Sequence, residues 1–230
     1  TGDWVCLQNC HLAKSWMLSL EQIVEGLQTN KDIDPEFRLW LTSMPAGHFP
    51  VPVLQNGIKI TMEPPKGVRA NIQRSYADLS EGYLETCEKG AAFKKLVFSC
   101  SFFHAVIQER RKFGPLGWNK AYDFSNSDLE TSLMTLRNFL NEQEQIPWSA
   151  MVYVTGMINY GGRVTDDLDR RLLMSVLRKY YTHEVLDDSY KFTESGVYRA
   201  PLEGDFESYA SYIRDLPLAE GPDVFGMHEN

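Results

Sequence analysis

Two neighbouring amides, Gln8 and Asn9, follow an apolar run that begins at Trp4. An apolar strand that turns polar just before a helix is how nucleotide-hydrolysing α/β domains place the acids that hold Mg²⁺ and orient the attacking water. Gln8 and Asn9 offer neutral carbonyl oxygens and amide donors, and neither side chain can act as a base. The sequence therefore predicts that the shape of such a site is retained without its catalytic chemistry.

Other residues of chemical interest have simpler interpretations. Asp166, Asp167 and Asp169 suggest either a metal cluster or the start of a helix, and acids in a first helical turn are stabilised by the helix dipole, which favours capping. His104 lies on an apolar helical face and is interpreted as a hydrogen-bonded core histidine rather than a base. His11 follows the strand end, but no nucleophile pairs with it. We expect no catalytic residue in this chain.

Metal binding is also not expected. Cys6, Cys10, Cys87 and Cys100 make no C-x-x-C pair, which suits a reducing compartment. Cys6, Cys10 and His11 are not followed by a second ligand pair at the spacing of a zinc site. The chain also lacks the phosphate-loop motif G-x-x-x-x-G-K-[ST], the nucleophile motif G-x-S-x-G and the zinc motif H-E-x-x-H.

Composition indicates a globular protein of 230 residues, in which 43% of the residues are hydrophobic. The 31 acidic residues outnumber the 23 basic ones, so a nucleic-acid partner is not expected. No apolar run reaches the ~18 residues of a membrane span, and no membrane partner is expected. The chain begins just before an expected strand, which we interpret as the start of an excised fragment.

The first 66 residues alternate strands with one helix. We predict strands over residues 4–8, 37–41 and 57–62, and a helix over 12–27, where apolar residues recur every three or four positions. Strand, helix and strand in this order imply a right-handed parallel crossover. Thr42 and Ser43 then follow the second strand as Gln8 and Asn9 follow the first.

From Gly67 onward the pattern is helical. A capping box of Ser127 and Glu130 is expected to start one helix, and Phe103 and Leu133 are expected to share one buried cluster. The sequence thus predicts an α/β part, residues 1–66, followed by a mostly α part, residues 67–230. The expected helices cover residues 68–76, 93–110, 127–140, 148–157, 165–180 and 206–213.

Several long motifs, in order along nearly the whole chain, resemble the C-terminal motor region of dynein heavy chains. They are W-V-C-L-Q-N-C-H-L (4–12), F-R-L-W-L-T-S (37–43), V-L-Q-N-G (53–57), E-P-P-K-G (63–67), Q-E-R (108–110), K-F-G-P-L-G-W (112–118) and N-Y-G-G-R-V (159–164). Residues 55–57 and 159–164 resemble the ciliary, or axonemal, type.

The resemblance implies a place in the motor ring. Residues 1–66 would be the second half of the large subdomain of the sixth AAA+ module, with a partial parallel sheet, and residues 67–230 its α-helical lid. That module binds no nucleotide, and Gln8 and Asn9 would stand at its vestigial Walker B positions. Thr42 and Ser43 would fall at the sensor-1 position, where they would cap the strand. No cofactor is implied here, and ATP and Mg²⁺ would belong to other modules.

The implied function is a non-catalytic, force-relaying segment of an ATP-driven microtubule motor in the cytoplasm, cytoskeleton and ciliary axoneme. Implied partners are the neighbouring AAA+ modules and the C-terminal domain of the same heavy chain. Microtubules and the dynein intermediate and light chains would be reached only through the parent motor. One alternative is a segment with residual nucleotide binding, in which Arg69, Arg74 or Arg163 contacts phosphates. Another is a free-standing interaction module.

Overall fold

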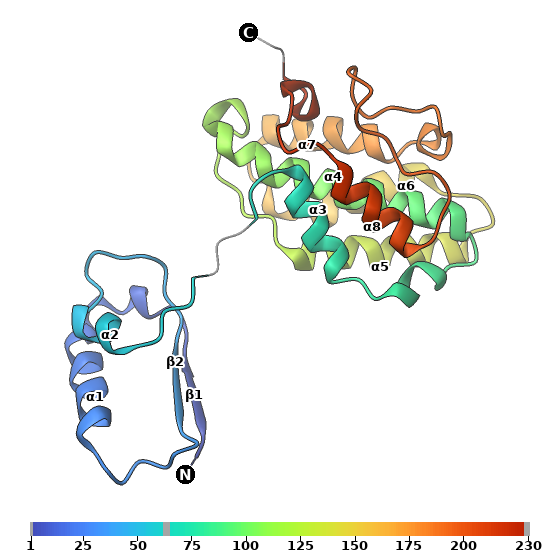
Figure 1. The fold of residues 1–230 in the computed structure, drawn as a ribbon. Helices are drawn as coiled ribbons and strands as arrows, with labels where there is room; N and C mark the ends of the chain where they lie inside the picture. The colour runs from blue at the N-terminus through green and yellow to red at the C-terminus, as the bar shows by residue number, and fades with distance from the viewer. Residues whose placement is uncertain (1, 62–64, 228–230) are drawn as a thin grey trace. The chain divides into compact units, whose positions relative to one another are not determined.

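A computed structural model describes residues 2–61 and 65–227 of the chain. The chain divides into two compact units, Thr1–Glu63 and Pro64–Asn230 (Figure 1). The first unit combines a parallel strand pair with helices, and the second is built from helices, which confirms the predicted α/β and mostly α classes.

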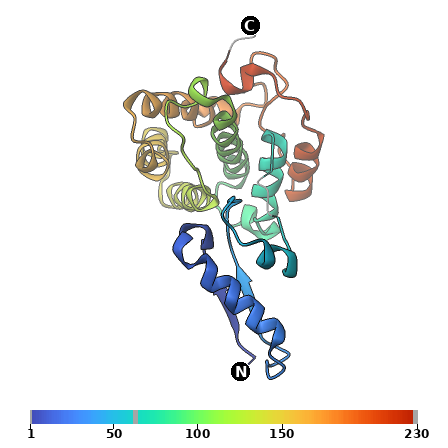
Figure 2. The same cartoon turned by 90° about the vertical axis from the view of Figure 1, so that its left-hand side faces the viewer.

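The first unit is built on two parallel strands. Strand β1 (Trp4–Leu7) pairs in parallel with β2 (Arg38–Leu41), and Leu7 lies opposite Leu41. Helix α1 (Met17–Thr29) connects them and runs along the strand pair (Figure 2). The predicted parallel crossover is therefore confirmed. The small core of this unit contains Cys10, Met17, Leu20 and Val53, with Leu7 and Leu41 packed against it.

Two details of the first unit differ from the prediction. The expected strand over 57–62 is wrong, because a short helix α2 (Val51–Asn56) precedes residues 57–61 and these residues form no strand; Met62 lies outside the described residues. Pro52 suits the first turn of α2, where a missing backbone N–H leaves no hydrogen bond unmade. Ile58 is 94% exposed, and within residues 2–61 and 65–227 no strand pairs with the alternating segment around it. Helix α1 also begins later than predicted, after 3₁₀ turns at Cys10–Leu12 and Lys14–Trp16.

The second unit packs its helices around one long central helix. Figures 1 and 2 show this central helix, α4, among the others, and every residue from Lys95 to Ile107 is buried. Phe103 and Leu133 belong to the same buried cluster, as predicted. The helices are α3 (Val68–Ala77), α4 (Gly90–Glu109), α5 (Asn126–Glu142), α6 (Trp148–Tyr153), the π-helix Val154–Asn159, α7 (Asp167–Tyr180) and α8 (Phe206–Asp215). Short 3₁₀ turns lie at Glu81–Glu85, Arg110–Leu116, Gly161–Arg163, His183–Leu186 and Pro222–Phe225.

Central burial explains the composition of α4. Together with the turn that follows it (Gly90–Leu116), this helix is long and apolar enough to cross a membrane, but 78% of its apolar stretch is buried in the unit. A helix that is covered on all sides by other helices needs no polar face, so its sequence is a nearly continuous apolar run. The run is therefore explained by the core of this unit.

The capping signals predicted the start of α7 correctly and placed the start of α5 two residues too late. The capping box of α5 is formed by Ser125 and Asp128, not by Ser127 and Glu130, so the predicted helix start is two residues late. Asp128 accepts from the backbone N–H of Ser125 at 2.8 Å, the role expected of Glu130. At α7 the prediction is confirmed, because Asp166 accepts from the backbone N–H groups of the first turn.

Candidate functional site at the strand ends

Thr42 ties the ends of β1 and β2 together. Its backbone N–H donates to the carbonyl oxygen of Leu7 at 3.0 Å, and its own carbonyl oxygen accepts from the N–H of Cys10 at 2.9 Å. The Thr42 hydroxyl oxygen accepts from the backbone N–H of Asn9 at 3.0 Å. The hydroxyl that resembles a sensor-1 group thus holds the turn after β1.

The two amide side chains at the end of β1 are exposed to solvent. Asn9 has a left-handed backbone (φ 55°, ψ 41°), a conformation that asparagine tolerates better than most residues. Neither Gln8 nor Asn9 uses its side-chain amide in a hydrogen bond within the described part of the chain. The site presents two neutral amides, which bring neither the negative charge that carboxylates give to Mg²⁺ nor a base for water.

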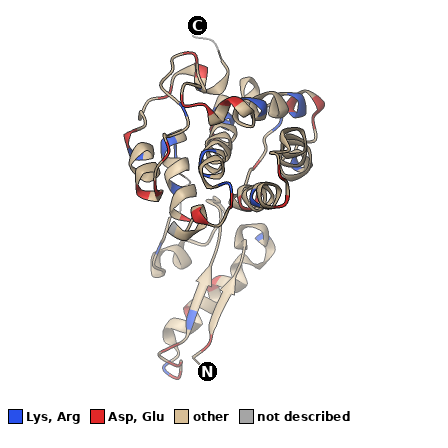
Figure 3. Cartoon of the chain, turned by 90° about the vertical axis from the view of Figure 1, so that its right-hand side faces the viewer, with Lys and Arg blue, Asp and Glu red and all other residues tan. Residues whose placement is uncertain are grey.

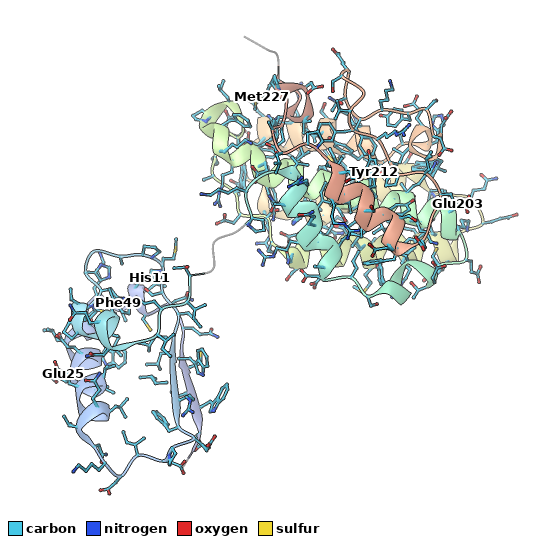
Figure 4. All side chains as sticks on the ribbon, viewed as in Figure 1. His11, Glu25, Phe49, Glu203, Tyr212 and Met227 are labelled. Atoms are coloured by element: carbon cyan, nitrogen blue, oxygen red, sulfur yellow. The ribbon has the colours of Figure 1, made fainter. Side chains whose placement is uncertain are left out.

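The neighbouring loop is supported by histidines. His11 Nδ1 accepts from the backbone N–H of Met44 at 3.2 Å, and His48 Nε2 lies 2.9 Å from the carbonyl oxygen of His11. Ser43 donates its hydroxyl to the carbonyl oxygen of Met44 at 2.8 Å. Figure 4 labels His11 at the same end of the first unit as Phe49. His11 therefore supports the loop after β2.

The cysteines of this region differ in exposure. Cys6 is exposed, whereas Cys10 is buried and donates its thiol to the carbonyl oxygen of Leu7 at 3.3 Å. Burial raises the pKa of the Cys10 thiol, which disfavours the thiolate that metals and electrophiles require. Across residues 2–61 and 65–227, His, Cys, Asp and Glu side chains form no group of three or more that could hold a metal ion.

Two of the three arginines considered for phosphate binding hold helices, and the third lines a cleft. Arg69 donates to the carbonyl oxygens of Arg214 and Leu216, at 3.2 and 3.3 Å, and so closes the end of α8. Arg163 forms an ion pair with Asp128 at 2.8 Å, which joins the turn after the π-helix to the start of α5. Arg74 lines a cleft of about 720 Å³ in the helical unit.

His104 is a core histidine, as interpreted from the sequence. Its side chain is 1% exposed, and its Nδ1 lies 2.9 Å from the hydroxyl oxygen of Tyr160. Burial lowers the pKa of His104 to about 4, so the imidazole is neutral at pH 7. The hydrogen bond joins α4 to the end of the π-helix.

Asp169 does more than the sequence indicates. It is 2% exposed and accepts from the backbone N–H groups of Asn119 and Lys120, at 2.9 and 3.2 Å, and from the hydroxyl of Tyr122 at 2.9 Å. The carboxylate thus fixes the segment after Trp118 against α7. No local signal could have revealed this role, because the partners lie about fifty residues away in the sequence.

The comparisons with known proteins identify the family. Residues 1–61 match the dynein heavy chain region D6 P-loop domain, and residues 93–230 match the dynein heavy chain AAA lid domain. Over its whole length the chain is 50% identical to human dynein axonemal heavy chain 3, 48% identical to human dynein axonemal heavy chain 6 and 50% identical to mouse dynein axonemal heavy chain 12. It spans only 6% to 8% of the length of these relatives.

The matches follow the same order as the two units of the structure, a strand-containing unit and then a helical one. The motifs noted in the sequence lie in both. The chain therefore belongs to the dynein heavy chain family, as a segment of the axonemal type.

Proposed function

We propose that this chain is a non-catalytic, force-relaying segment of an axonemal dynein heavy chain, an ATP-driven microtubule motor. In this proposal residues 1–66 are the second half of an AAA+ large subdomain and residues 67–230 are its lid. The family matches support the assignment of the two parts.

The observation that carries the non-catalytic part is the pair of exposed amides at the end of β1. Phosphoryl transfer to water relies on Mg²⁺ held by oxygen ligands that include a carboxylate, and on a group that orients the water. Gln8 and Asn9 bring no carboxylate, and the hydroxyl of Thr42 is engaged by the N–H of Asn9. The other hydrogen bonds around the strand ends join groups of the first unit to one another. In this proposal they stabilise the first unit and take no part in catalysis.

The packing of the helical unit supports a mechanical role. Densely packed interiors have low compressibility and transmit strain, and switching elements are usually packed interfaces rather than single reactive groups. The buried apolar residues of this unit form one continuous cluster around α4. Polar contacts of His104 and Arg163 join α4 and α5 to the segment after the π-helix, and Asp169 joins α7 to the segment after Trp118. Such a unit can pass a displacement from one helix to another.

The parent motor supplies the rest of the activity in this proposal. ATP and Mg²⁺ belong to other modules, and this segment holds no cofactor. Its direct partners are the neighbouring AAA+ modules and the C-terminal domain of the same heavy chain, while microtubules and the intermediate and light chains are reached through the parent motor. The names of the relatives support a location in the cytoskeleton of the ciliary axoneme. Figure 3 shows Lys and Arg interspersed with Asp and Glu, and no nucleic-acid or membrane partner is proposed.

Calorimetric titration of the 230-residue chain with Mg-ATP tests the non-catalytic part. We expect no heat of binding, because the end of β1 carries no carboxylate and the sequence contains no phosphate-loop motif. A micromolar dissociation constant would contradict the proposal and favour residual nucleotide binding. In that case, loss of the heat in Arg74→Ala would place the nucleotide in the cleft of the helical unit.

A further inference from the structure

Glu220 connects two distant parts of the helical unit. Its side chain is only 8% exposed. One carboxylate oxygen accepts from the backbone N–H of Val68, the first residue of α3, and the other accepts from Lys112 Nζ at 2.9 Å. Val68 and Glu220 are 152 residues apart in the sequence, so this carboxylate joins the beginning of the unit to its end.

Gly67 fits this contact closely. Its φ of +95° lies in a region that other residues rarely adopt, and a Cβ atom at this position would lie 2.9 Å from Glu220 Oε1. The backbone before α3 is therefore shaped to receive the carboxylate. A side chain at residue 67 would have to displace Glu220.

Lys112 extends the connection to the end of the described chain. Its ammonium group lies 4.7 Å from the centre of the Phe225 ring and 5.2 Å from that of Phe113, in addition to its ion pair with Glu220. A second ion pair joins it to Glu109 at 3.4 Å. Lys112 thus contacts both ends of residues 220–225.

Two further contacts complete the arrangement. Asn71 on α3 donates to Glu109 Oε1 at 2.9 Å and to the carbonyl oxygen of Pro65 at 3.2 Å, which ties the segment before α3 to the end of α4. The buried guanidinium of Arg110 donates to the carbonyl oxygen of Phe225 and to that of Gly117. The start of α3, the end of α4 and residues 220–225 therefore form one polar junction.

We propose that Glu220 and Lys112 form a lock that couples the C-terminal segment, residues 219–227, to the start of α3, where the chain enters the helical unit. Displacing the C-terminal segment withdraws the carboxylate from Val68 and Lys112 and loosens the first turn of α3. Because coupling between two sites is reciprocal, loosening the start of α3 also loosens the C-terminal segment. This proposal rests on the proposed mechanical function. It names the contacts through which a displacement would pass between the C-terminal segment and the start of α3.

Amide hydrogen exchange of the 230-residue chain, resolved by residue, tests the first direction. In Glu220→Ala the amides of residues 68–71 should exchange about tenfold faster, as expected for a lost helix cap, while the centre of α4 keeps its protection. Glu207→Gln is the matched control, because it removes an exposed ion pair with Arg214 outside the junction. Should Glu220→Ala fail to fold, Glu220→Leu, which also removes both acceptor oxygens, replaces it. Unchanged exchange at residues 68–71 overturns the lock.

The reverse direction separates a coupling device from a simple cap. Gly67→Ala should accelerate exchange at residues 223–226, whereas Gly90→Ala, whose new Cβ would meet no atom within 4 Å, should not. Acceleration confined to residues 65–71 would mean that the contact is only a local cap, and it would overturn the proposal. Binding of Mg-ATP would refute the proposed non-catalytic function but leave these exchange results unaffected, so the two failures can be distinguished.

Discussion

Truncation of Leu133 should strongly destabilise the helical unit. This side chain lies on the inner face of α5, is 3% exposed and belongs to the cluster around α4. Leu→Ala changes at buried positions lower the free energy of unfolding by ~2–5 kcal/mol, with the larger losses where the site cannot collapse. Ser132 and Asp128 on the same helix are held by Asn159 and Arg163, which keeps α5 in place. We therefore expect the upper half of that range for Leu133→Ala.

Urea unfolding followed by far-ultraviolet circular dichroism measures this loss, since most of the helices lie in this unit. The matched control is Met134→Ala, one residue further along α5, where the side chain is 51% exposed. A substitution there should change the free energy of unfolding by less than ~0.5 kcal/mol. If Leu133→Ala is no less stable than Met134→Ala, the reasoning from the buried face of α5 is refuted.

Three further predictions concern packing, pH and the small first unit. Gly156→Ala should lower the unfolding free energy by ~1–3 kcal/mol because its Cβ would lie 2.4 Å from Met174 Sδ, while Gly162→Ala, with open space around it, should be nearly neutral in the same urea assay. The folded-state pKa of His104, about 4, lies below its ordinary value of 6.5, so its neutral form contributes fully to the free energy of unfolding above pH 6.5. This contribution falls as the pH drops from 6.5 toward 4. The free energy of unfolding should therefore decrease by ~2 kcal/mol from pH 7 to pH 5, and this decrease should be absent in His104→Gln. Amides of β2 (Arg38–Leu41) should exchange faster than those of the central helix, because this strand has one partner among the described residues and a small core beneath it; equal protection would contradict this expectation.

The helices of the second unit could be predicted because their signal is local. Apolar residues at steps of three and four define the buried faces of α5 and α7, and the long apolar run of α4 indicates a helix that is buried on all sides. Helix starts are less certain where two polar pairs compete, as at α5. Ser125 with Asp128 and Ser127 with Glu130 have the same spacing, and the sequence alone does not rank them.

The strand over 57–62 could not be judged from its own residues. Alternation describes a strand only if another strand lies beside it, and Ile58 and Ile60 are instead exposed. The polar junctions could not be predicted from the sequence for a similar reason. Glu220 and Asp169 have hydrogen-bond partners 152 and about 50 residues away, so their roles depend on the assembled fold. At the candidate site, the sequence alone indicated that amides stand at the end of β1. The hydrogen bond from the Asn9 N–H to the Thr42 hydroxyl could not be predicted, because it depends on the pairing of β1 with β2.

The central claim, that the end of β1 performs no nucleotide chemistry, is tested most directly in a complete heavy chain that carries this segment. The measurement is the steady-state ATPase rate of the variant with Gln8→Ala and Asn9→Ala, compared with the unaltered motor. We predict the same rate within about twofold, because exposed neutral amides bring neither the negative charge that carboxylates give to Mg²⁺ nor a base for water. A fall of about a hundredfold or more, the effect of losing a group that acts in the chemical step, would contradict the account.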